Sequence, residues 1–203
     1  MVLYFVRHGE TDWNVRKKIQ GKTDIPLNEN GIGQAQALAA KLFEKKQRGS
    51  LKVARAYSSP QLRALRTAQI AADALAVECV ALEDLREMDL GVWEGLNWDI
   101  IQATYGDTYH YWNDHRRYTH TPDGESYNEV LGRTLRALEE ILERETGDVL
   151  VVSHSAILMS LQCYLARLPF EEMVRRFKTK NTQVVEISAE DVREAIRRFA
   201  AGE

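Results

Sequence analysis

The sequence predicts an α/β fold, a three-layer α/β/α sandwich with a mostly parallel central sheet and a small helical cap or loop region. Short apolar runs alternate with helical patterns along the chain, as in sheets covered by helices on both faces. The apolar runs lack polar alternation, which is typical of buried parallel strands. The chain has 203 residues and 44% hydrophobic content, so we expect one domain over residues 1–203 with a sizeable core.

Four runs are predicted as strands, because turn residues bound short β-branched or apolar segments. They are Val2–Val6, Lys52–Tyr57, Val149–Val152 and Val184–Ile187. The charged stretch after Ile187 has a helical pattern.

Helical periodicity appears between these runs. One predicted helix has an apolar face made of Ala35, Leu38, Ala39, Leu42 and Phe43. A second runs through Val130–Leu142, with a potential capping box of Ser126 and Glu129 before it and Gly147 at its expected end. A third, around Ile157–Leu165, is apolar on most sides and is expected at the centre of the molecule.

The pattern weakens over residues 88–123, where aromatic side chains are interleaved with polar ones and with His110, His115 and His120. We expect a cap-like elaboration with short helices beside the sheet. Its aromatic side chains are expected to serve packing more often than ligand contact.

Composition excludes several classes. The formal net charge of −3 argues against a general nucleic-acid-binding surface. The start resembles no signal peptide and no run approaches the ~18 apolar residues of a membrane helix, so we expect a cytoplasmic protein without a membrane partner. Cys79 and Cys163 lack metal-ligand spacing and are expected to be core thiols. Nothing in the sequence indicates the oligomeric state.

Candidate site residues follow three of the predicted strands. Arg7 and His8 follow the first, Ser58-Ser59-Pro60 leads to Arg63 after the second, and Ser153-His154 follows the third. The carboxyl ends of parallel strands meet at one edge of a sheet, so these groups should converge. Guanidinium and imidazole groups together suit phosphate binding and nucleophilic attack on phosphorus.

The sequence resembles the histidine phosphatase superfamily, also called the phosphoglycerate mutase-like group. Six segments carry the resemblance in family order: VRHGETDWN at Val6–Asn14, QGKTDIPLNENG at Gln20–Gly31, SSPQLRALRTA at Ser58–Ala68, LREMDLGVWEG at Leu85–Gly95, GES at Gly124–Ser126 and VVSHS at Val151–Ser155. One departure is Asp123, which stands where many relatives have a second glycine and should stiffen that loop.

The resemblance implies a role for each matching position. His8 is implied as the nucleophile that becomes phosphorylated and Glu87 as the proton donor. The implied phosphate ligands are Arg7, Arg63, His154, Asn14 and the backbone amide of Ser155, while Gln20 and Gly21 lie in a loop that borders the substrate in the family.

General chemistry supports the same assignments. Cationic and hydrogen-bonding groups must neutralise the phosphoryl oxygens before a nucleophile can attack. His8 must be neutral, with one ring nitrogen held by an acceptor such as a backbone carbonyl. Glu87 must stay protonated near neutral pH, which burial or a neighbouring carboxylate, Asp89 or Glu94, could arrange.

The residue types also allow an alternative to a phosphate site, namely a hydrolytic metal site made of His8, Glu87 and His154. The guanidiniums of Arg7 and Arg63 would oppose a dication and favour an anion, so we expect no metal and no cofactor. Arg66 is expected to face solvent, and the run Arg16-Lys17-Lys18 is interpreted as a hydrated surface that could also steer anions.

The leading hypothesis is a metal-independent phosphatase that hydrolyses a small phosphorylated metabolite. The first alternative is a cofactor-dependent phosphoglycerate mutase; mutases of the family are typically longer, but Arg116 and Arg117 could hold a substrate carboxylate. The second alternative is a non-catalytic protein that binds phosphorylated ligands or protein partners. The intact set of catalytic residues disfavours this alternative. Family substrates such as phosphoserine, α-ribazole phosphate, sugar phosphates and phosphoglycerates are candidates, and the fold names none of them.

Overall fold

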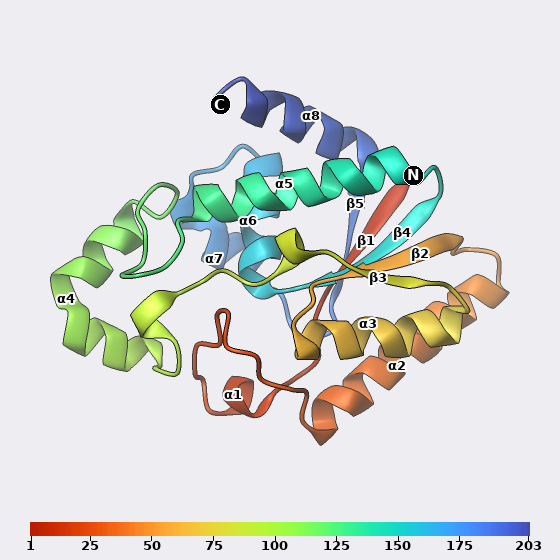
Figure 1. The fold of residues 1–203 in the computed structure, drawn as a ribbon, viewed down its shortest axis with the longest axis horizontal. Helices are drawn as coiled ribbons and strands as arrows, with labels where there is room; N and C mark the ends of the chain where they lie inside the picture. Colours follow the sequence, from red (N-terminus) through yellow and green to blue (C-terminus); the bar gives the residue numbers. More distant parts are fainter.

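A computed structural model describes all residues 1–203 and contains one five-stranded sheet between layers of helices (Figure 1). The strand order is β3-β2-β4-β1-β5. Neighbouring strands are parallel except for β5, which runs antiparallel to β1 at the edge. The predicted α/β architecture with a mostly parallel sheet is therefore confirmed. The strands are β1 (Val2–Arg7), β2 (Val53–Ser58), β3 (Cys79–Ala81), β4 (Asp148–Ser153) and β5 (Val184–Ser188).

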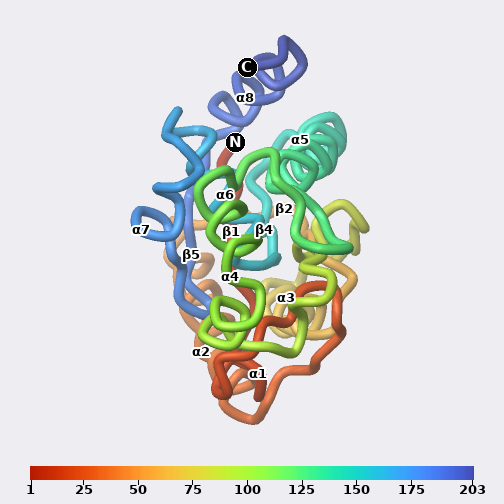
Figure 2. Tube along the Cα trace, turned by 90° about the vertical axis from the view of Figure 1, so that its left-hand side faces the viewer, coloured from red at the N-terminus to blue at the C-terminus, as the bar shows by residue number.

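The helices fall into two layers and one protruding end. Helices α2 and α3 pack together on one face of the sheet, while α5, α6 and α8 cover the other. Figures 1 and 2 show α4 at one end of the molecule, outside both helical layers. The helices are α1 (Asp12–Val15), α2 (Glu29–Gln47), α3 (Leu62–Leu75), α4 (Trp98–Asp114), α5 (Tyr127–Arg144), α6 (Ser155–Leu165), α7 (Met173–Phe177) and α8 (Ala189–Ala200), with 3-10 turns at Glu83–Leu85, Gly91–Trp93 and Phe170–Glu172.

Strand β1 shows why its sequence is apolar throughout. Leu3 and Phe5 lie in the core shared with α5, α6 and α8, whereas Tyr4 and Val6 lie in the core shared with α2 and α3. Successive side chains of a strand point to opposite faces, so burial of both faces leaves no position for polar residues in the middle of the strand.

Two details of the helix predictions are wrong. Phe43 of α2 is 45% exposed, so the apolar face of that helix stops at Leu42. Helix α5 begins with the predicted Ser126–Glu129 capping box, but it ends at Arg144 and not at Gly147. The backbone of Glu145 is extended, so the helix has ended there. The Glu145 carboxylate accepts a hydrogen bond from the Tyr57 hydroxyl of β2 at 2.8 Å, which holds the chain beside β2 before Gly147 is reached.

The strand β3 escaped prediction because three residues are too few for a periodic pattern. The charged C-terminal stretch forms helix α8, which follows the antiparallel edge strand β5. Cys163 is buried and Cys79 is half-buried in β3; both are free thiols, and burial raises the pKa of each to about 11.

Residues 88–123 contain the 3-10 turn Gly91–Trp93 and two short helical segments that meet at a kink within α4, in agreement with the prediction of short helices. Helix α4 has 17 residues and is kinked at Gly106, whose φ of 14° is non-helical. Its aromatic side chains pack on the loop before it, with Trp112 edge-to-face on Trp93 at a ring separation of 5.1 Å. The aromatic residues of this region thus build a small core of their own.

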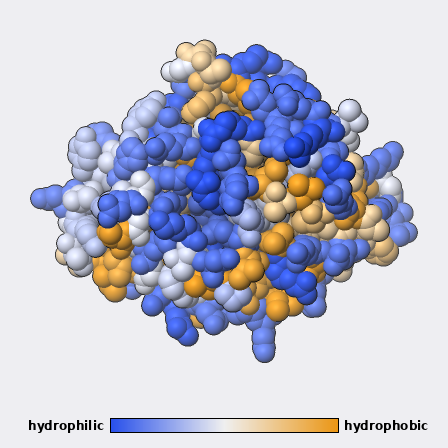
Figure 3. Space-filling model, in the orientation of Figure 1, coloured by the Kyte–Doolittle hydropathy of each residue, from blue (hydrophilic) through white to orange (hydrophobic).

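The molecular surface is mostly hydrophilic on the face shown in Figure 3, where apolar residues appear as separate patches. No helix combines the length and the apolar character needed to cross a membrane.

Candidate active site

The carboxyl ends of three parallel strands bring the predicted residues to one edge of the sheet. The amide of His8, just past β1, donates to the Ser153 carbonyl of β4 at 3.0 Å, and the amide of Ser59, just past β2, donates to the Val152 carbonyl at 3.0 Å. The imidazole rings of His8 and His154 lie with their centroids 5.2 Å apart. The convergence expected from strand ends is therefore present.

His8 is buried and neutral. Its Nδ1 lies 2.6 Å from the carbonyl oxygen of Gly9, and a carbonyl can only accept, so Nδ1 carries the proton and Nε2 keeps its lone pair. Burial, followed by the positive charges of Arg63 and Arg7, holds the pKa of His8 well below its usual value. An imidazole in this state is a nucleophile at neutral pH.

Arg63 is fully buried without a carboxylate partner. Its Nη1 donates to the Thr23 carbonyl at 2.9 Å and its Nη2 to the Gly21 carbonyl at 2.8 Å, while its Nε is buried with no hydrogen-bond partner. Burial lowers its pKa. A buried cation held only by neutral carbonyls retains positive charge that an anion can neutralise.

Arg7 repeats this arrangement from the other side. Its Nη1 donates to the Thr179 carbonyl at 2.7 Å, and its Nε is likewise buried without a partner. Burial lowers the pKa of Arg7, and the nearby carboxyl of Glu87 partly opposes that shift. The two guanidiniums together make an electropositive site beside the His8 ring.

His154 is a neutral member of this cluster. It is fully buried, and burial followed by the charge of Arg63 holds its pKa well below the usual value. Its Nε2 lies 2.8 Å from the hydroxyl of Ser59, while Nδ1 is buried and unpartnered. A neutral imidazole can bind a phosphoryl oxygen only by donating a hydrogen bond, so cationic stabilisation falls to the arginines.

Glu87 comes from the loop after β3 and its carboxyl reaches the N-terminus of α6. One carboxyl oxygen accepts from the Met88 amide at 3.0 Å and the other lies 3.4 Å from the Ala156 amide. Burial raises the pKa of Glu87, although those hydrogen bonds and Arg63 act in the opposite direction. A carboxyl whose pKa is raised can act as a general acid.

Neighbouring carboxylates do not cause this shift, contrary to one of the two sequence-based expectations. Asp89 pairs with Lys22 at 2.8 Å, and Glu94 accepts hydrogen bonds from the amides of Lys22 and Thr23 at 2.8 and 3.1 Å. Both carboxylates are engaged in holding the 20–24 loop, and neither is among the causes of the raised pKa of Glu87, of which burial is the largest.

The loop residues Gln20 and Gly21 act on other protein groups. The side-chain oxygen of Gln20 accepts from the Thr11 hydroxyl at 3.0 Å. Gly21 has a left-handed φ of +53°, and a Cβ there would lie 2.0 Å from a carboxyl oxygen of Glu94. Gly21 therefore lets its carbonyl approach Arg63 and hold that side chain in place.

Asn14 and Ser155 lie at helix starts near the cluster. The Asn14 side-chain oxygen accepts from the Thr11 amide at 3.1 Å in the capping box of α1, which leaves its amide hydrogens available to a ligand. Ser155 is the first residue of α6, a position where backbone amides have no partner within the helix. Such amides suit an anion.

Three residues near the cluster, Gln61, Thr179 and Asn181, escaped sequence reasoning. Gln61 links two parts of the cluster through its side chain. Its Nε2 donates to the Gly21 carbonyl at 3.0 Å, and its Oε1 accepts from the backbone amide of Glu87 at 2.7 Å. The Asn181 amide donates to the His8 carbonyl at 2.8 Å. Gln61 belongs to the same SSPQLR segment as Ser59, which the sequence had indicated, and could have been found there, whereas nothing local indicates Asn181 or Thr179.

The remaining candidate arginines lie elsewhere. Arg66 is exposed, as predicted. Arg116 stacks over Trp112 at 4.9 Å, and Arg117 donates to the Glu203 carbonyl at 2.6 Å and to Asn128 at 3.2 Å. The two side chains do not form a pair, and Arg117 is tied to Asn128 and Glu203 through two of its five N–H donors. No group of three or more His, Cys, Asp or Glu side chains is arranged to hold a metal ion.

This geometry defines a class of enzyme: an α/β sandwich that presents a neutral imidazole, a protonatable carboxyl and two unpaired guanidiniums handles phosphate esters. A family model described as the histidine phosphatase superfamily, branch 1, matches residues 3–201, and the chain belongs to this family. It is thus a phosphomonoester hydrolase by family, and the same family includes mutases.

Known proteins agree with this placement. "Phosphoglycerate mutase-like protein 4" of Arabidopsis thaliana is 36% identical, over 77% of this chain and 67% of its own length. The "Metal-independent phosphoserine phosphatase" of the same plant is 33% identical, over 78% of this chain and 66% of its own. The solved structure of mycobacterial glucosyl-3-phosphoglycerate phosphatase with VO3 has a TM-score of 0.81 and 27% identity, covering 92% of this chain and 90% of that one.

Proposed function

We propose that the protein is a metal-independent phosphatase that hydrolyses a small phosphomonoester metabolite through a phosphohistidine on His8. The observation that carries the proposal is the His8 imidazole, neutral and with its tautomer fixed by the Gly9 carbonyl, beside guanidiniums that lack a carboxylate partner. A hydrolytic metal is unnecessary in this proposal because Arg7 and Arg63 supply the positive charge.

In the first step, the lone pair of His8 Nε2 attacks phosphorus while the bond from phosphorus to the ester oxygen breaks. Glu87 gives its proton to the departing oxygen, so the alcohol leaves neutral. In the second step, Glu87 accepts a proton from water as the water oxygen attacks phosphorus. The P–N bond then breaks, inorganic phosphate forms, and His8 returns to its neutral state.

The other residues bind the transferring group in this proposal. Arg7 and Arg63 neutralise its oxygens, and His154, Asn14 and the Ser155 amide donate hydrogen bonds. Gln20 and Gly21, which the resemblance places beside the substrate, fit a supporting role, because their contacts are with Thr11 and Arg63.

The substrate is proposed to be a small phosphorylated metabolite. The chain forms one domain over residues 1–203 in this proposal, and the cap-like residues 88–123 select the substrate. Phosphoserine is the first candidate, since a relative carries that activity in its name. A cytoplasmic location and the absence of nucleic-acid or membrane partners stay predictions.

A mutase is the second candidate, because another relative is named phosphoglycerate mutase-like. The phosphohistidine would then return its phosphoryl group to a bound sugar acid. The different contacts of the two arginines weigh against this alternative, because Arg116 stacks over Trp112 while Arg117 is tied to Glu203 and Asn128, and they do not form a pair around one carboxylate.

The test is phosphate release from a panel of phosphomonoesters in the presence of EDTA, with mutase product scored separately. Wild-type protein quenched during turnover should carry one acid-labile phosphoryl group, and the His8→Ala variant should carry none and release no phosphate. Phosphate release by the His8→Ala variant at the wild-type rate would contradict the assignment, and phosphoglycerate interconversion without net phosphate release would favour the mutase.

A further inference from the structure

Outside the cluster around His8, a buried ion pair joins α5 to the loop that carries Glu87. Arg133 lies in α5, with a side chain only 3% exposed. Its Nε donates to one carboxyl oxygen of Glu125 at 2.9 Å and its Nη2 to the other at 3.0 Å. Both oxygens of the carboxylate are thus engaged by one guanidinium, the geometry that gives the strongest arginine–carboxylate pairs.

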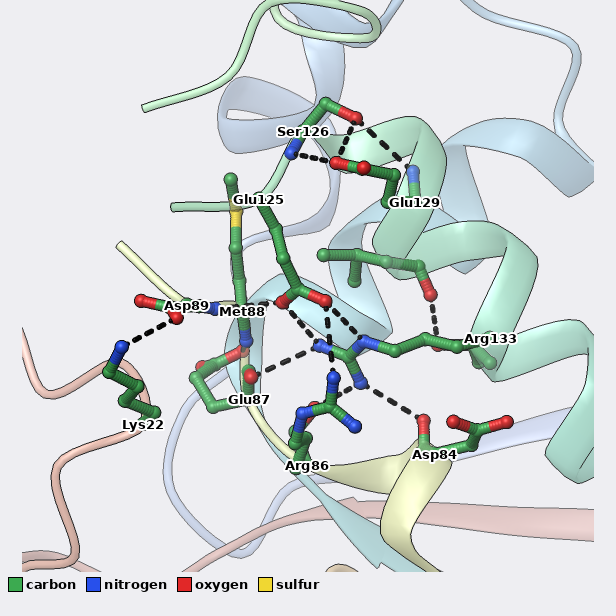
Figure 4. Close-up of polar contacts among 12 residues, drawn as sticks. Lys22, Asp84, Arg86, Glu87, Met88, Asp89, Glu125, Ser126, Glu129 and Arg133 are labelled. Carbon is green, nitrogen blue, oxygen red and sulfur yellow. Dashed lines mark hydrogen bonds and ion pairs between the residues drawn. The ribbon is translucent and has the colours of Figure 1, made fainter. Parts of the chain in front are cut away.

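The same guanidinium also binds the main chain on either side of Glu87. Its Nη1 donates to the carbonyls of Asp84 and Arg86 at 3.0 and 2.6 Å, and its Nη2 donates to the carbonyl of Glu87 itself at 3.0 Å. Glu125 also binds this loop, because its carboxylate accepts a hydrogen bond from the backbone amide of Asp89 at 2.8 Å. Figure 4 shows these contacts converging on Arg133 and Glu125 from the loop.

This loop needs such support. Residues 86–90 lie between two 3-10 turns and belong to no strand or helix, so no regular ladder holds the backbone of Glu87. Its amide is bound by the Gln61 side chain at 2.7 Å, and its carbonyl by Arg133. A general acid must be placed to within a fraction of an ångström, because misplacement slows proton transfer.

The contacts separate positioning from direct electrostatic action. Arg133 binds the Glu87 backbone, while the Glu87 carboxyl contacts the Met88 and Ala156 amides. Glu125 contacts Arg133 directly and also pairs with Arg86 at 3.5 Å. The charge of Arg133 adds to the lowering of the His154 pKa, but the groups that shift the pKa of Glu87 are its burial, two backbone amides, Arg63 and Arg7. Arg133 also uses all three guanidinium nitrogens for these bonds, and the single ammonium of a lysine cannot reproduce that fork.

We propose that Arg133, oriented by Glu125, is a positioning residue that fixes the backbone of Glu87 so that its carboxyl can protonate the leaving group. This inference rests on the proposed function, in which Glu87 is the general acid. It predicts a defect specific to proton donation, whereas a buried pair that only stabilises the fold would affect every substrate alike.

Two substrates separate these roles. p-Nitrophenolate leaves without needing a proton, whereas the alkoxide of an alkyl phosphate such as phosphoserine needs one. For each variant we would measure kcat/KM with both compounds on the same preparation. The ratio of the two values is independent of the fraction of folded protein, so a destabilised variant still gives an answer.

The test variants are Arg133→Lys and Glu125→Gln, with Glu87→Gln as the reference for lost proton donation. Arg136→Met is the matched control, since Arg136 lies on the same helix and contacts the same segment, through Asp84 at 3.2 Å, but is 66% exposed. We expect Arg133→Lys and Glu125→Gln to lower the alkyl-to-aryl ratio by about 10-fold or more, and Arg136→Met to leave it unchanged. The double variant should fall no further than either single one, because the pair acts as a unit.

A second readout is the pH profile of kcat for the alkyl substrate. A loosened Glu87 becomes more solvated and loses part of the burial that raises its pKa, so the alkaline limb of the Arg133→Lys profile should move to lower pH. An unchanged ratio and profile in both variants would overturn the inference and leave a structural ion pair. If Glu87→Gln itself leaves the ratio unchanged, the general-acid assignment fails, which is a distinct result.

Discussion

The nucleophile and the general acid of this protein are held in place by different means. His8 follows a central strand, and its amide and carbonyl bond to Ser153 and Asn181. Glu87 sits in an irregular loop whose backbone is held by the side chains of Gln61 and Arg133. The phosphate-binding half of the site, around His8 and Arg63, is thus placed by strand pairing. The acid half, which is Glu87 and its loop, depends on individual side chains and should be easier to disturb.

The largest effect should come from the phosphate-binding half. Replacing Arg63 by Ala removes a buried cation from the proposed site, and we expect kcat/KM to fall by at least about 10³-fold with both alkyl and aryl phosphates. Arg66→Ala is the control, since Arg66 lies one turn further along the same helix and is exposed. Equal losses in the two variants would contradict the placement of Arg63 in the site.

The acid half should reveal itself in the pH dependence. The pKa of Glu87 is raised by burial, so kcat for an alkyl phosphate should fall as the pH rises through that value and the proton is lost. Glu87→Gln should lower kcat for this substrate by about 10²-fold or more and abolish the alkaline limb. A limb that persists in Glu87→Gln would assign the titration to another group.

The low-pH limb of the kcat profile tests the phosphate-binding half, through the charge state of His8. The pKa of His8 is held well below its usual value by burial and by Arg63, so protonation of His8 should not reduce kcat until the pH is well below 6.5. In Arg63→Met, the loss of that charge should move the acid limb to higher pH. An acid limb that stays in place would show that Arg63 does not set the charge state of His8.

The Gly21 loop connects the two halves and should show an intermediate effect. Gly21→Ala places a methyl group 2.0 Å from a Glu94 carboxyl oxygen at a left-handed φ, so the loop must shift and the carbonyl that holds Arg63 moves with it. We expect about a 10-fold loss in kcat/KM and about 1–3 kcal/mol of stability. Gly49→Ala, also at positive φ but with open space around it, is the control and should cost stability alone, measured by denaturant unfolding.

The smallest effect should come from the loop before β5. Asn181→Ala removes the side-chain amide that binds the His8 carbonyl, while the strand pairing of β1 remains. We expect a loss of about 10-fold or less in kcat and about 1 kcal/mol of stability. Gln183→Ala, in the same loop but exposed, should leave kcat unchanged; a larger loss than in the Arg63 variant would reverse the ranking of the two halves.

Several parts of this description were predictable from local sequence. Strands β1 and β4 were recognisable because both of their faces are covered and their central residues are therefore apolar. His8, Arg63 and His154 were predictable as neighbours because parallel strands end at one edge. The Ser126–Glu129 cap is a local arrangement and was also correct.

Other parts depended on contacts between distant segments. The helix before Gly147 ends early because Glu145 reaches Tyr57, 88 residues away. The cause of the raised pKa of Glu87 required knowledge of its burial, since Asp89 and Glu94 are near in sequence but bind Lys22 and Thr23. Asn181 approaches His8 because β5 is antiparallel, which places the start of that strand at the same edge as the end of β1.

By itself, the sequence determined the sandwich class, the family and the residue types of the phosphate-binding cluster, because buried strands and short motifs carry their information locally. Only the tertiary structure decided how Glu87 is held and why its pKa is raised. That outcome depends on burial and on hydrogen bonds from Gln61, Arg133 and Glu125, and no spacing along the chain encodes which side chains meet around an irregular loop.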